Sequence, residues 1–255
     1  MRNKRYILLA IFSLLIAIMI LGSQGLWATE KKVYINGIDA NFVPFSYIDD
    51  QGNAVGFDIE CINWIAKEMG FEVKNMPISW DAIIPALNAK KIDLIASGMT
   101  ITEERKKVVD FTIPYWPTDQ AVMAREDSDL NIINALSGKY TVGVNRGCSA
   151  QTWIEKNLIE KGILGEDKLK LYESALMAIN DVVNGRIDVS LGDELMFKQA
   201  IKEKPLKIIG IIKSGDAYGY AVRKEDQELK EMLSEGLRRL MKSPKWDEFV
   251  TNMYE

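Results

Sequence analysis

Short apolar runs alternate with segments of helical periodicity along the chain from residue 33 onward. In the segment 57–70, apolar side chains recur three and four positions apart and Gly70 follows the last of them, which predicts an amphipathic helix that ends at the glycine. The apolar runs at 33–37 and 71–78 predict strands on either side of this helix. Such alternation is typical of an α/β protein.

The alternation occurs in both halves of the chain. Further strands are predicted at 92–97, 140–145, 168–173 and 187–192, and further helices at 80–91, 149–158 and 174–185. The halves also share a local pattern, because 88–98 and 183–193 each contain a helix end, a basic residue, Ile-Asp and an apolar strand. Gly98 and Asp193 therefore hold equivalent positions just past two strand ends. The sequence predicts two lobes of similar construction.

The segments 110–125 and 208–224 separate the halves and contain Pro, Gly and extended residues. We interpret them as two crossings between the lobes, which returns the last helical stretch, 227–243, to the first lobe. The predicted fold class is α/β, with two lobes that are each a mostly parallel sheet flanked by helices and are joined by two hinge crossings. The predicted boundaries are 33–116 plus 220–255 for lobe 1 and 117–219 for lobe 2.

The first residues differ from this pattern. A basic start over residues 1–5 precedes an uncharged stretch from Tyr6 to Thr29. This arrangement predicts a cleaved signal peptide over 1–28 and export to the periplasm. The alternative is an uncleaved membrane anchor, since about 20 apolar residues span a bilayer, but the dense apolar part at 7–21 is short for a span.

Charge and composition exclude several classes of function. Without residues 1–28 the chain carries 29 basic and 36 acidic residues, a net charge of −7, so nucleic acid is not an expected partner. The absence of histidine removes most hydrolase triads and most zinc catalysis, and no metal or cofactor is expected. Cys61 lies in a helical pattern and is predicted to be a small buried residue, although a disulfide with Cys148 is allowed in an exported protein.

The stretch 97–105, Ser-Gly-Met-Thr-Ile-Thr-Glu-Glu-Arg, follows a predicted strand. Thr100, three residues before Glu103, fits a helix capping box, which is the purely structural alternative. A helix start after a strand also binds anions, and Arg105 adds a planar fork of donors suited to a carboxylate. Asp193 in the other half either caps the next helix or attracts an ammonium group. If Arg105 and Asp193 face each other across a cleft, they form a receptor for the zwitterionic head of an α-amino acid.

Five motifs carry a resemblance to a known family. The chain resembles the periplasmic amino-acid-binding proteins of ABC importers, solute-binding protein family 3, over essentially all of residues 33–255. The motifs are DANFVPFSY (39–47), GFDIECINWIA (56–66), SGMTITEER with VDFTIPY (97–115), VGVNRGCS (142–149) and GRIDVSLGD (185–193). The resemblance implies a type II periplasmic-binding-protein fold, capture of a free L-amino acid by hinge closure, and delivery to a membrane permease. It also implies a monomer that is not an enzyme.

The resemblance assigns ligand contacts residue by residue. Arg105 and the backbone around Thr100, which includes Met99, would hold the ligand carboxylate, and Asp193, helped by the Gly98 carbonyl, would hold the ammonium. Phe42 and Trp80 would sandwich the ligand side chain. Cys148 and Ser149 stand where the family usually has Thr, so that hydroxyl contact is either lost or supplied by Ser149.

Selectivity for the ligand side chain is assigned to Asp39, Asn145 and Gly192. Asp39 matches the position where relatives for lysine, arginine, ornithine or glutamine have an acid, and Asp119 is either a second acid of the site or plain surface. Acids beside aromatic rings favour a cationic side chain. We therefore expect lysine, arginine or ornithine, with glutamine next. The alternatives are an enzyme resembling cyclohexadienyl or arogenate dehydratase, and a membrane-tethered amino-acid sensor.

Overall fold

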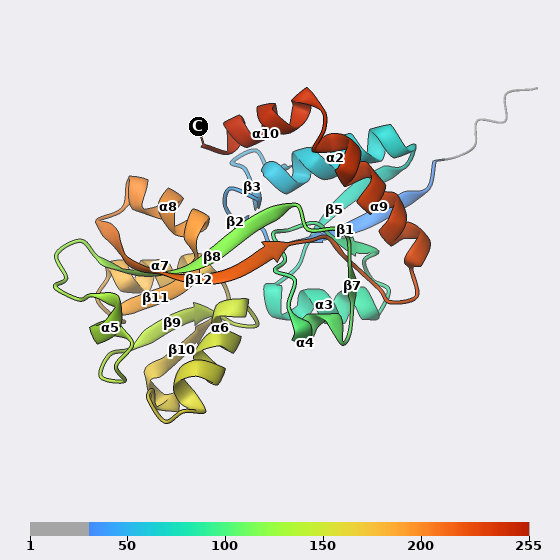
Figure 1. Ribbon diagram of the computed structural model, residues 1–255. Coiled ribbons are helices and arrows are strands. Elements are labelled where there is room, and N and C mark those ends of the chain that lie inside the picture. Colours follow the sequence, from blue (N-terminus) through green and yellow to red (C-terminus); the bar gives the residue numbers. More distant parts are fainter. Residues whose placement is uncertain (1–30, 255) are drawn as a thin grey trace, which may run out of the picture. The chain divides into compact units, whose positions relative to one another are not determined.

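The computed structural model describes residues 31–254, so the predicted signal peptide lies outside the described residues. Two five-stranded mixed sheets, each with its own helices, form two lobes (Figure 1). In each sheet four strands run in one direction, and the fourth strand in order, at 221–222 in one sheet and at 116–125 in the other, runs opposite to them. The predicted two-lobed α/β fold is confirmed.

The first lobe contains the start and the end of the described chain. Its sheet has the order β5 (Glu72–Pro77), β1 (Val33–Ile38), β6 (Leu94–Ile95), β13 (Ala221–Val222) and β7 (Asp110–Phe111). Its helices are α2 (Phe57–Met69), α3 (Trp80–Asn88), α4 (Glu103–Lys106), α9 (Gln227–Leu240) and α10 (Pro244–Tyr254). A small sheet of β2 (Asn41–Phe42), β3 (Ser46–Ile48) and β4 (Ala54–Val55) is also present, and neither this sheet nor α10 was predicted from the sequence.

The second lobe is built in the same way. Its sheet has the order β10 (Leu169–Tyr172), β9 (Val142–Asn145), β11 (Val189–Asp193), β8 (Trp116–Arg125) and β12 (Leu206–Tyr218). Its helices are α5 (Ile132–Ala135), α6 (Ser149–Ile154), η1 (Glu155–Ile159), η2 (Glu166–Lys168), α7 (Ala175–Val183) and α8 (Glu194–Glu203).

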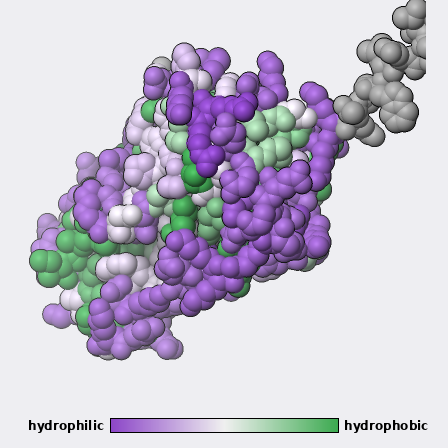
Figure 2. Space-filling model, turned by 45° about the vertical axis from the view of Figure 1, so that its right-hand side comes forward, coloured by the Kyte–Doolittle hydropathy of each residue, from purple (hydrophilic) through white to green (hydrophobic). Residues whose placement is uncertain are grey.

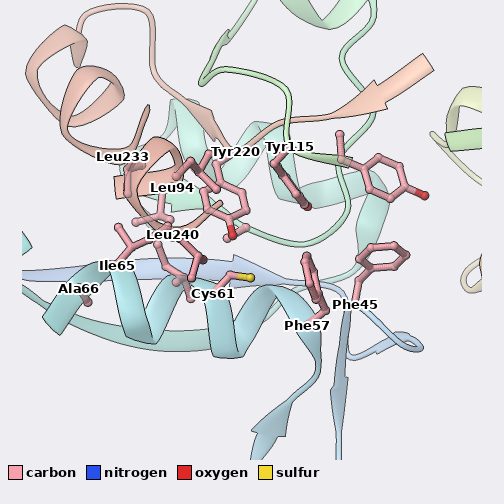
Figure 3. Close-up of a cluster of buried hydrophobic side chains, with 14 of the residues drawn as sticks. Phe45, Phe57, Cys61, Ile65, Ala66, Leu94, Tyr115, Tyr220, Leu233 and Leu240 are labelled. Atoms are coloured by element: carbon pink, nitrogen blue, oxygen red, sulfur yellow. The ribbon is translucent and has the colours of Figure 1, made fainter. Parts of the chain in front are cut away.

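Helix α2 shows why the local sequence forms these elements. Its apolar side chains, including Ile62 and Ile65, are fully buried, and Gly70 ends the helix in the left-handed conformation with φ 80°. Cys61 is also fully buried and is free, as its place in the helical pattern predicts. Figure 3 shows this face of α2 packed toward Tyr220 and toward leucines of α9. Helix α9 of the last helical stretch therefore packs on α2 of the first lobe.

Strands β8 and β12 make the two crossings. They pair antiparallel from Leu206 with Arg125 to Tyr218 with Trp116, and the chain continues from both into strands of the first sheet. Figure 1 shows the two strands side by side between the lobes. The predicted crossings are confirmed, whereas the predicted lobe boundaries near residues 116 and 219 stay a prediction.

The helix start near residue 100 differs from its prediction. Helix α4 has only four residues, and its N-cap is Thr102, whose hydroxyl accepts from the Arg105 N–H. Thr100 instead forms a β-bridge with Tyr218. The capping box that Thr100 and Glu103 suggest was therefore wrong, because pairing with a distant strand uses the backbone of Thr100.

None of the helices formed by residues 31–254 is both long and apolar enough to cross a bilayer. The face shown in Figure 2 is polar over most of its area, with apolar residues in a strip near its middle and at one end.

Candidate ligand-binding site

A cavity lies between the two lobes, beside the crossing strands. Its lining includes ten of the eleven predicted site residues, which are Asp39, Phe42, Trp80, Gly98, Thr100, Arg105, Asn145, Cys148, Ser149 and Asp193. Gly192 is also part of it. The space open to the centre of a water molecule is ≈ 60 Å³, which suits several waters or one small solute. The eleventh residue, Met99, is 1% exposed and packs in a hydrophobic cluster with residues of α3, so its side chain does not line the cavity.

Arg105 brings a buried positive charge into the cavity. Its Nη1 donates to the Thr100 carbonyl at 2.8 Å and its Nη2 donates to the Gly147 carbonyl at 3.1 Å, which joins the two lobes. The guanidinium also lies 5.3 Å from the centre of the Trp80 ring. Burial lowers the pKa of Arg105 below its usual value, although it stays charged. Since these bonds use two of the five guanidinium N–H groups, donors remain for a ligand carboxylate.

Three hydroxyl and amide groups lie near Arg105. The Ser149 hydroxyl is 3.3 Å from the Thr100 hydroxyl and accepts from Gln120 Nε2 at 3.3 Å. Cys148 acts as the N-cap of α6, where its Sγ accepts from the Gln151 N–H. Of Cys148 and Ser149, Ser149 is therefore the residue that presents a hydroxyl to the cavity.

Asp193 caps a helix, which is one of the two roles that the sequence left open, and its binding of an ammonium group stays a prediction. It is the last residue of β11 and the N-cap of α8, and its Oδ1 accepts from the N–H groups of Leu195 at 3.0 Å and Met196 at 3.2 Å. Its Oδ2 accepts from the hydroxyls of Thr118 and Tyr218. Burial raises the pKa of Asp193, and these donors oppose that rise.

Asp39 follows β1 and is 8% exposed. Its Oδ1 accepts from the Asn41 N–H at 2.9 Å, and burial raises the pKa of Asp39. No lysine or arginine among the described residues lies within ion-pair distance of it. Asp119, by contrast, is not part of the lining, because its carboxylate binds Lys213 Nζ at 2.7 Å and the Ser214 N–H at 3.1 Å.

Gly98 allows a close approach of backbone and ring. Its φ is +57°, and a Cβ at this position would lie 2.2 Å from the Phe42 ring. The Gly98 N–H donates to Asp58 Oδ2 at 2.5 Å. A side chain at residue 98 would therefore displace Phe42 from the cavity wall.

Sequence reasoning missed part of the lining. The missed residues are Gln120, Ala150, Ala175, Ser190, Leu191, Met196, Phe197 and Tyr218. Gln120 and Tyr218 lie on the crossing strands, and the signal available for them was that these crossings border any cleft between the lobes. Among the described residues, Gln120 Oε1 and Asn145 Oδ1 are buried without a hydrogen-bond partner.

Comparisons with known proteins can now be set beside this geometry. The family model described as bacterial extracellular solute-binding proteins, family 3, matches residues 34–254. The chain belongs to this family. The resemblance that the sequence motifs predicted is confirmed.

Several similar proteins in the family are named for cationic amino acids, and others are named for histidine or cystine. The chain is 35% identical over 213 residues to the L-arginine-binding protein of Pseudomonas aeruginosa, covering 80% of each. It is 28% identical to the lysine/arginine/ornithine-binding periplasmic protein of Escherichia coli K12, covering 86% of each. A solved structure of an ancestral arginine-binding protein bound to arginine matches with a TM-score of 0.81 and 34% identity, over 88% of this chain and 99% of that one.

Asp58, in the GFDIE motif, is a buried acid behind the cavity wall. It is fully buried, and its Oδ1 lacks a hydrogen bond of good geometry within residues 31–254 although the Tyr115 hydroxyl is nearby. Burial raises the pKa of Asp58 to about 7. The folded protein therefore holds a proton there that the unfolded chain releases near its ordinary pKa of 3.8.

This proton linkage predicts a loss of stability with rising pH. Between about pH 4 and pH 7 the native state binds more protons at Asp58, so the free energy of unfolding of the wild type falls relative to that of Asp58→Asn, by a few kcal/mol in all. Urea unfolding at one-unit steps from pH 4 to pH 8 measures the difference. Asp50→Asn, at an exposed acid, is the control and should run parallel to the wild type. Parallel curves for Asp58→Asn as well would contradict the prediction.

Proposed function

We propose that this chain is an extracytoplasmic solute-binding protein that captures a cationic L-amino acid, with arginine, lysine and ornithine favoured over glutamine. It then delivers the ligand to the permease of an ABC importer. The observation that best supports this proposal is the set of charges in the cavity. One guanidinium, Arg105, and two carboxylates, Asp39 and Asp193, line one space, and none of the three has an ion-pair partner among the described residues.

A cationic α-amino acid carries the complementary set of charges. Its carboxylate pairs with Arg105, its α-ammonium with Asp193, and its side-chain cation with Asp39. Buried charges are costly unless they are paired, so a ligand that lacks one of these groups leaves a cavity charge uncompensated. The relatives named for arginine, lysine and ornithine support this choice of side chain.

Capture occurs by closure of the two lobes about β8 and β12. Periplasmic binding proteins are themselves a known example of such hinge closure. Several contacts join the lobes in the described structure. On the cavity side they include Arg105 with the Gly147 carbonyl, Trp80 Nε1 with the same carbonyl at 3.3 Å, Thr100 with Ser149, and Lys156 with Glu104. Closure places the ligand charges in a dry site, where each hydrogen bond counts for more.

A thermal-shift panel of the twenty amino acids with ornithine and citrulline tests the proposal on the purified protein. At ligand concentrations about 100 times Kd, binding adds about 2.7 kcal/mol of stability, which gives a rise in Tm of several degrees. We expect this rise for arginine, lysine and ornithine. Citrulline is the matched control, because it has the shape of arginine without the charge, and it should give a clearly smaller shift.

Two outcomes would contradict this function. Stabilisation only by glutamate or aspartate would reject a cationic ligand. Formation of product from prephenate or arogenate would support the dehydratase alternative, whereas saturable binding without product agrees with a binding protein.

A further inference from the structure

We infer that the hydroxyl groups of Tyr218 and Thr118 are positioning groups that hold the Asp193 carboxylate in its ionised form and aim it at the ligand's α-ammonium. This inference rests on the proposed capture of an α-amino acid, but it does not depend on which side chain the ligand has. It adds a role for two residues of the crossing strands.

The hydrogen bonds of Asp193 are the first argument. A carboxylate offers about four acceptor sites. Oδ1 accepts two backbone N–H groups of α8, and Oδ2 accepts the hydroxyls of Thr118 and Tyr218. Each oxygen is thus fixed by two donors, so the carboxylate cannot rotate without breaking one of these pairs. An ammonium that reaches Oδ2 must do so beside the two hydroxyls, whose oxygens are available as further acceptors for its N–H groups.

The position of Tyr218 is the second argument. It is 1% exposed, and the backbone around it pairs with the loop of the first lobe through Ile101 N–H to the Ala217 carbonyl and Gly219 N–H to the Met99 carbonyl. Its ring lies edge-on to Phe45 with 5.0 Å between ring centres. The hydroxyl is therefore placed by the first lobe, while the carboxylate that it contacts belongs to the second.

Thr118 connects Asp193 to the other crossing strand, β8. It lies on β8 and pairs with Asp216 of β12, and its hydroxyl is also 3.3 Å from the Tyr218 hydroxyl. Each crossing strand therefore supplies one donor to Asp193, the acid that would bind the ammonium.

Burial and these contacts together set the direction in which the pKa values of Asp193 and Tyr218 shift. Burial raises the pKa of Asp193, and the two hydroxyls and the α8 backbone oppose it. Burial keeps the pKa of Tyr218 well above its usual value, so it remains a donor at every working pH. The other titratable groups of the lining are Asp39, Arg105 and Cys148. Outside the lining, Glu194 pairs with Lys198 on α8 and Asp119 pairs with Lys213 between the crossing strands, whereas two further acids, Asp58 near Tyr218 and Asp216 opposite Thr118, form no ion pair within residues 31–254.

Loss of either hydroxyl would change the protonation of Asp193. Removal of one hydroxyl leaves Oδ2 with a single donor and raises the pKa of Asp193 further. The ammonium binds the ionised carboxylate, so affinity is lost as pH falls through this pKa, and in the variant the loss begins at a higher pH. We expect Tyr218→Phe to bind L-arginine roughly 10-fold more weakly at pH 7 and to shift the acid limb upward by about one pH unit.

The test is the Kd for L-arginine, measured calorimetrically between pH 4.5 and pH 8 for the wild type, Tyr218→Phe, Thr118→Val and Tyr220→Phe. Tyr220 is the matched control, because it is buried two residues further along but does not line the cavity. The same titrations with 5-guanidinopentanoate, which lacks the α-ammonium, should show no effect of the Tyr218 or Thr118 changes. The Thr118 variant, which removes the hydroxyl with little change of shape, keeps the test valid if Tyr218→Phe folds poorly.

Each result has a defined meaning. A shifted acid limb in Tyr218→Phe and Thr118→Val but not in Tyr220→Phe supports the inference. Unchanged or tighter binding by Tyr218→Phe and Thr118→Val, or an equal loss with 5-guanidinopentanoate, overturns it. If the wild type prefers another α-amino acid, the titrations use that one, and only the proposed selectivity fails. Absence of binding by the wild type to any α-amino acid rejects the proposed function and this inference together.

Discussion

Replacement of Arg105 by alanine is expected to abolish the binding of every α-amino acid, with a rise in Kd on the order of 100-fold or more. The reason is that the guanidinium is the one cation of the described cavity lining, and it is buried with donors still available. A ligand carboxylate would lose its charged partner in a dry site. Isothermal titration with the amino acids that stabilise the wild type measures the change.

Three comparisons make this prediction specific. Arg105→Lys keeps the charge without the planar fork, and should fall between the wild type and the alanine variant. Arg186→Ala, at an arginine whose side chain is 71% exposed, should bind like the wild type. Argininamide, which lacks the carboxylate, should bind the wild type and Arg105→Ala about equally weakly. A Kd for arginine that stays within about threefold in Arg105→Ala would contradict the assignment.

The fold was predictable where local patterns decide it. Helix α2 needed only its apolar spacing and Gly70, and the repeated pattern at 88–98 and 183–193 indicated two lobes. The N-cap of α4 was not predictable in this way, because Thr100 has Glu103 at capping-box spacing, whereas Thr102, the actual N-cap, has Arg105 at that position. A contact with Tyr218, far along the chain, removes Thr100 from that role. Tertiary pairing of this kind leaves no trace in a local window.

The same difference between local and tertiary signals decides which site residues could be predicted. Asp193 could be found because parallel strands present their carboxyl ends to a common edge, whereas Asp39 was assigned only through the family resemblance. Gln120 and Tyr218 could not, since extended crossing strands carry no periodic sign of which side chains turn toward a cavity. The two hydroxyls on Asp193 likewise come from strands that only the topology brings together. The side chain of Met99 points into the core, so any contact of Met99 with a ligand is left to its backbone.

Replacement of Asp39 by asparagine is expected to change which amino acid is preferred. Asparagine has the same shape and can keep the hydrogen bond from the Asn41 N–H, so the cavity loses only a negative charge. We expect the affinity for L-arginine to fall by about 10- to 100-fold, while that for citrulline or glutamine changes little. The ratio of the two Kd values, measured by calorimetry at pH 7.5, is the quantity to compare.

Asp119→Asn is the matched control for this change. Asp119 is also an acid near the crossings, but its carboxylate binds Lys213 outside the cavity lining, so its loss should leave the ratio unchanged. An equal loss of affinity for arginine and citrulline in Asp39→Asn would mean that residue 39 supports the cavity wall without sensing the ligand's charge. A shift in the ratio for Asp119→Asn would place the selective charge at the crossing instead. If Asp39 determines selectivity, Asp39→Asn changes the ratio of the two Kd values and Asp119→Asn leaves it unchanged.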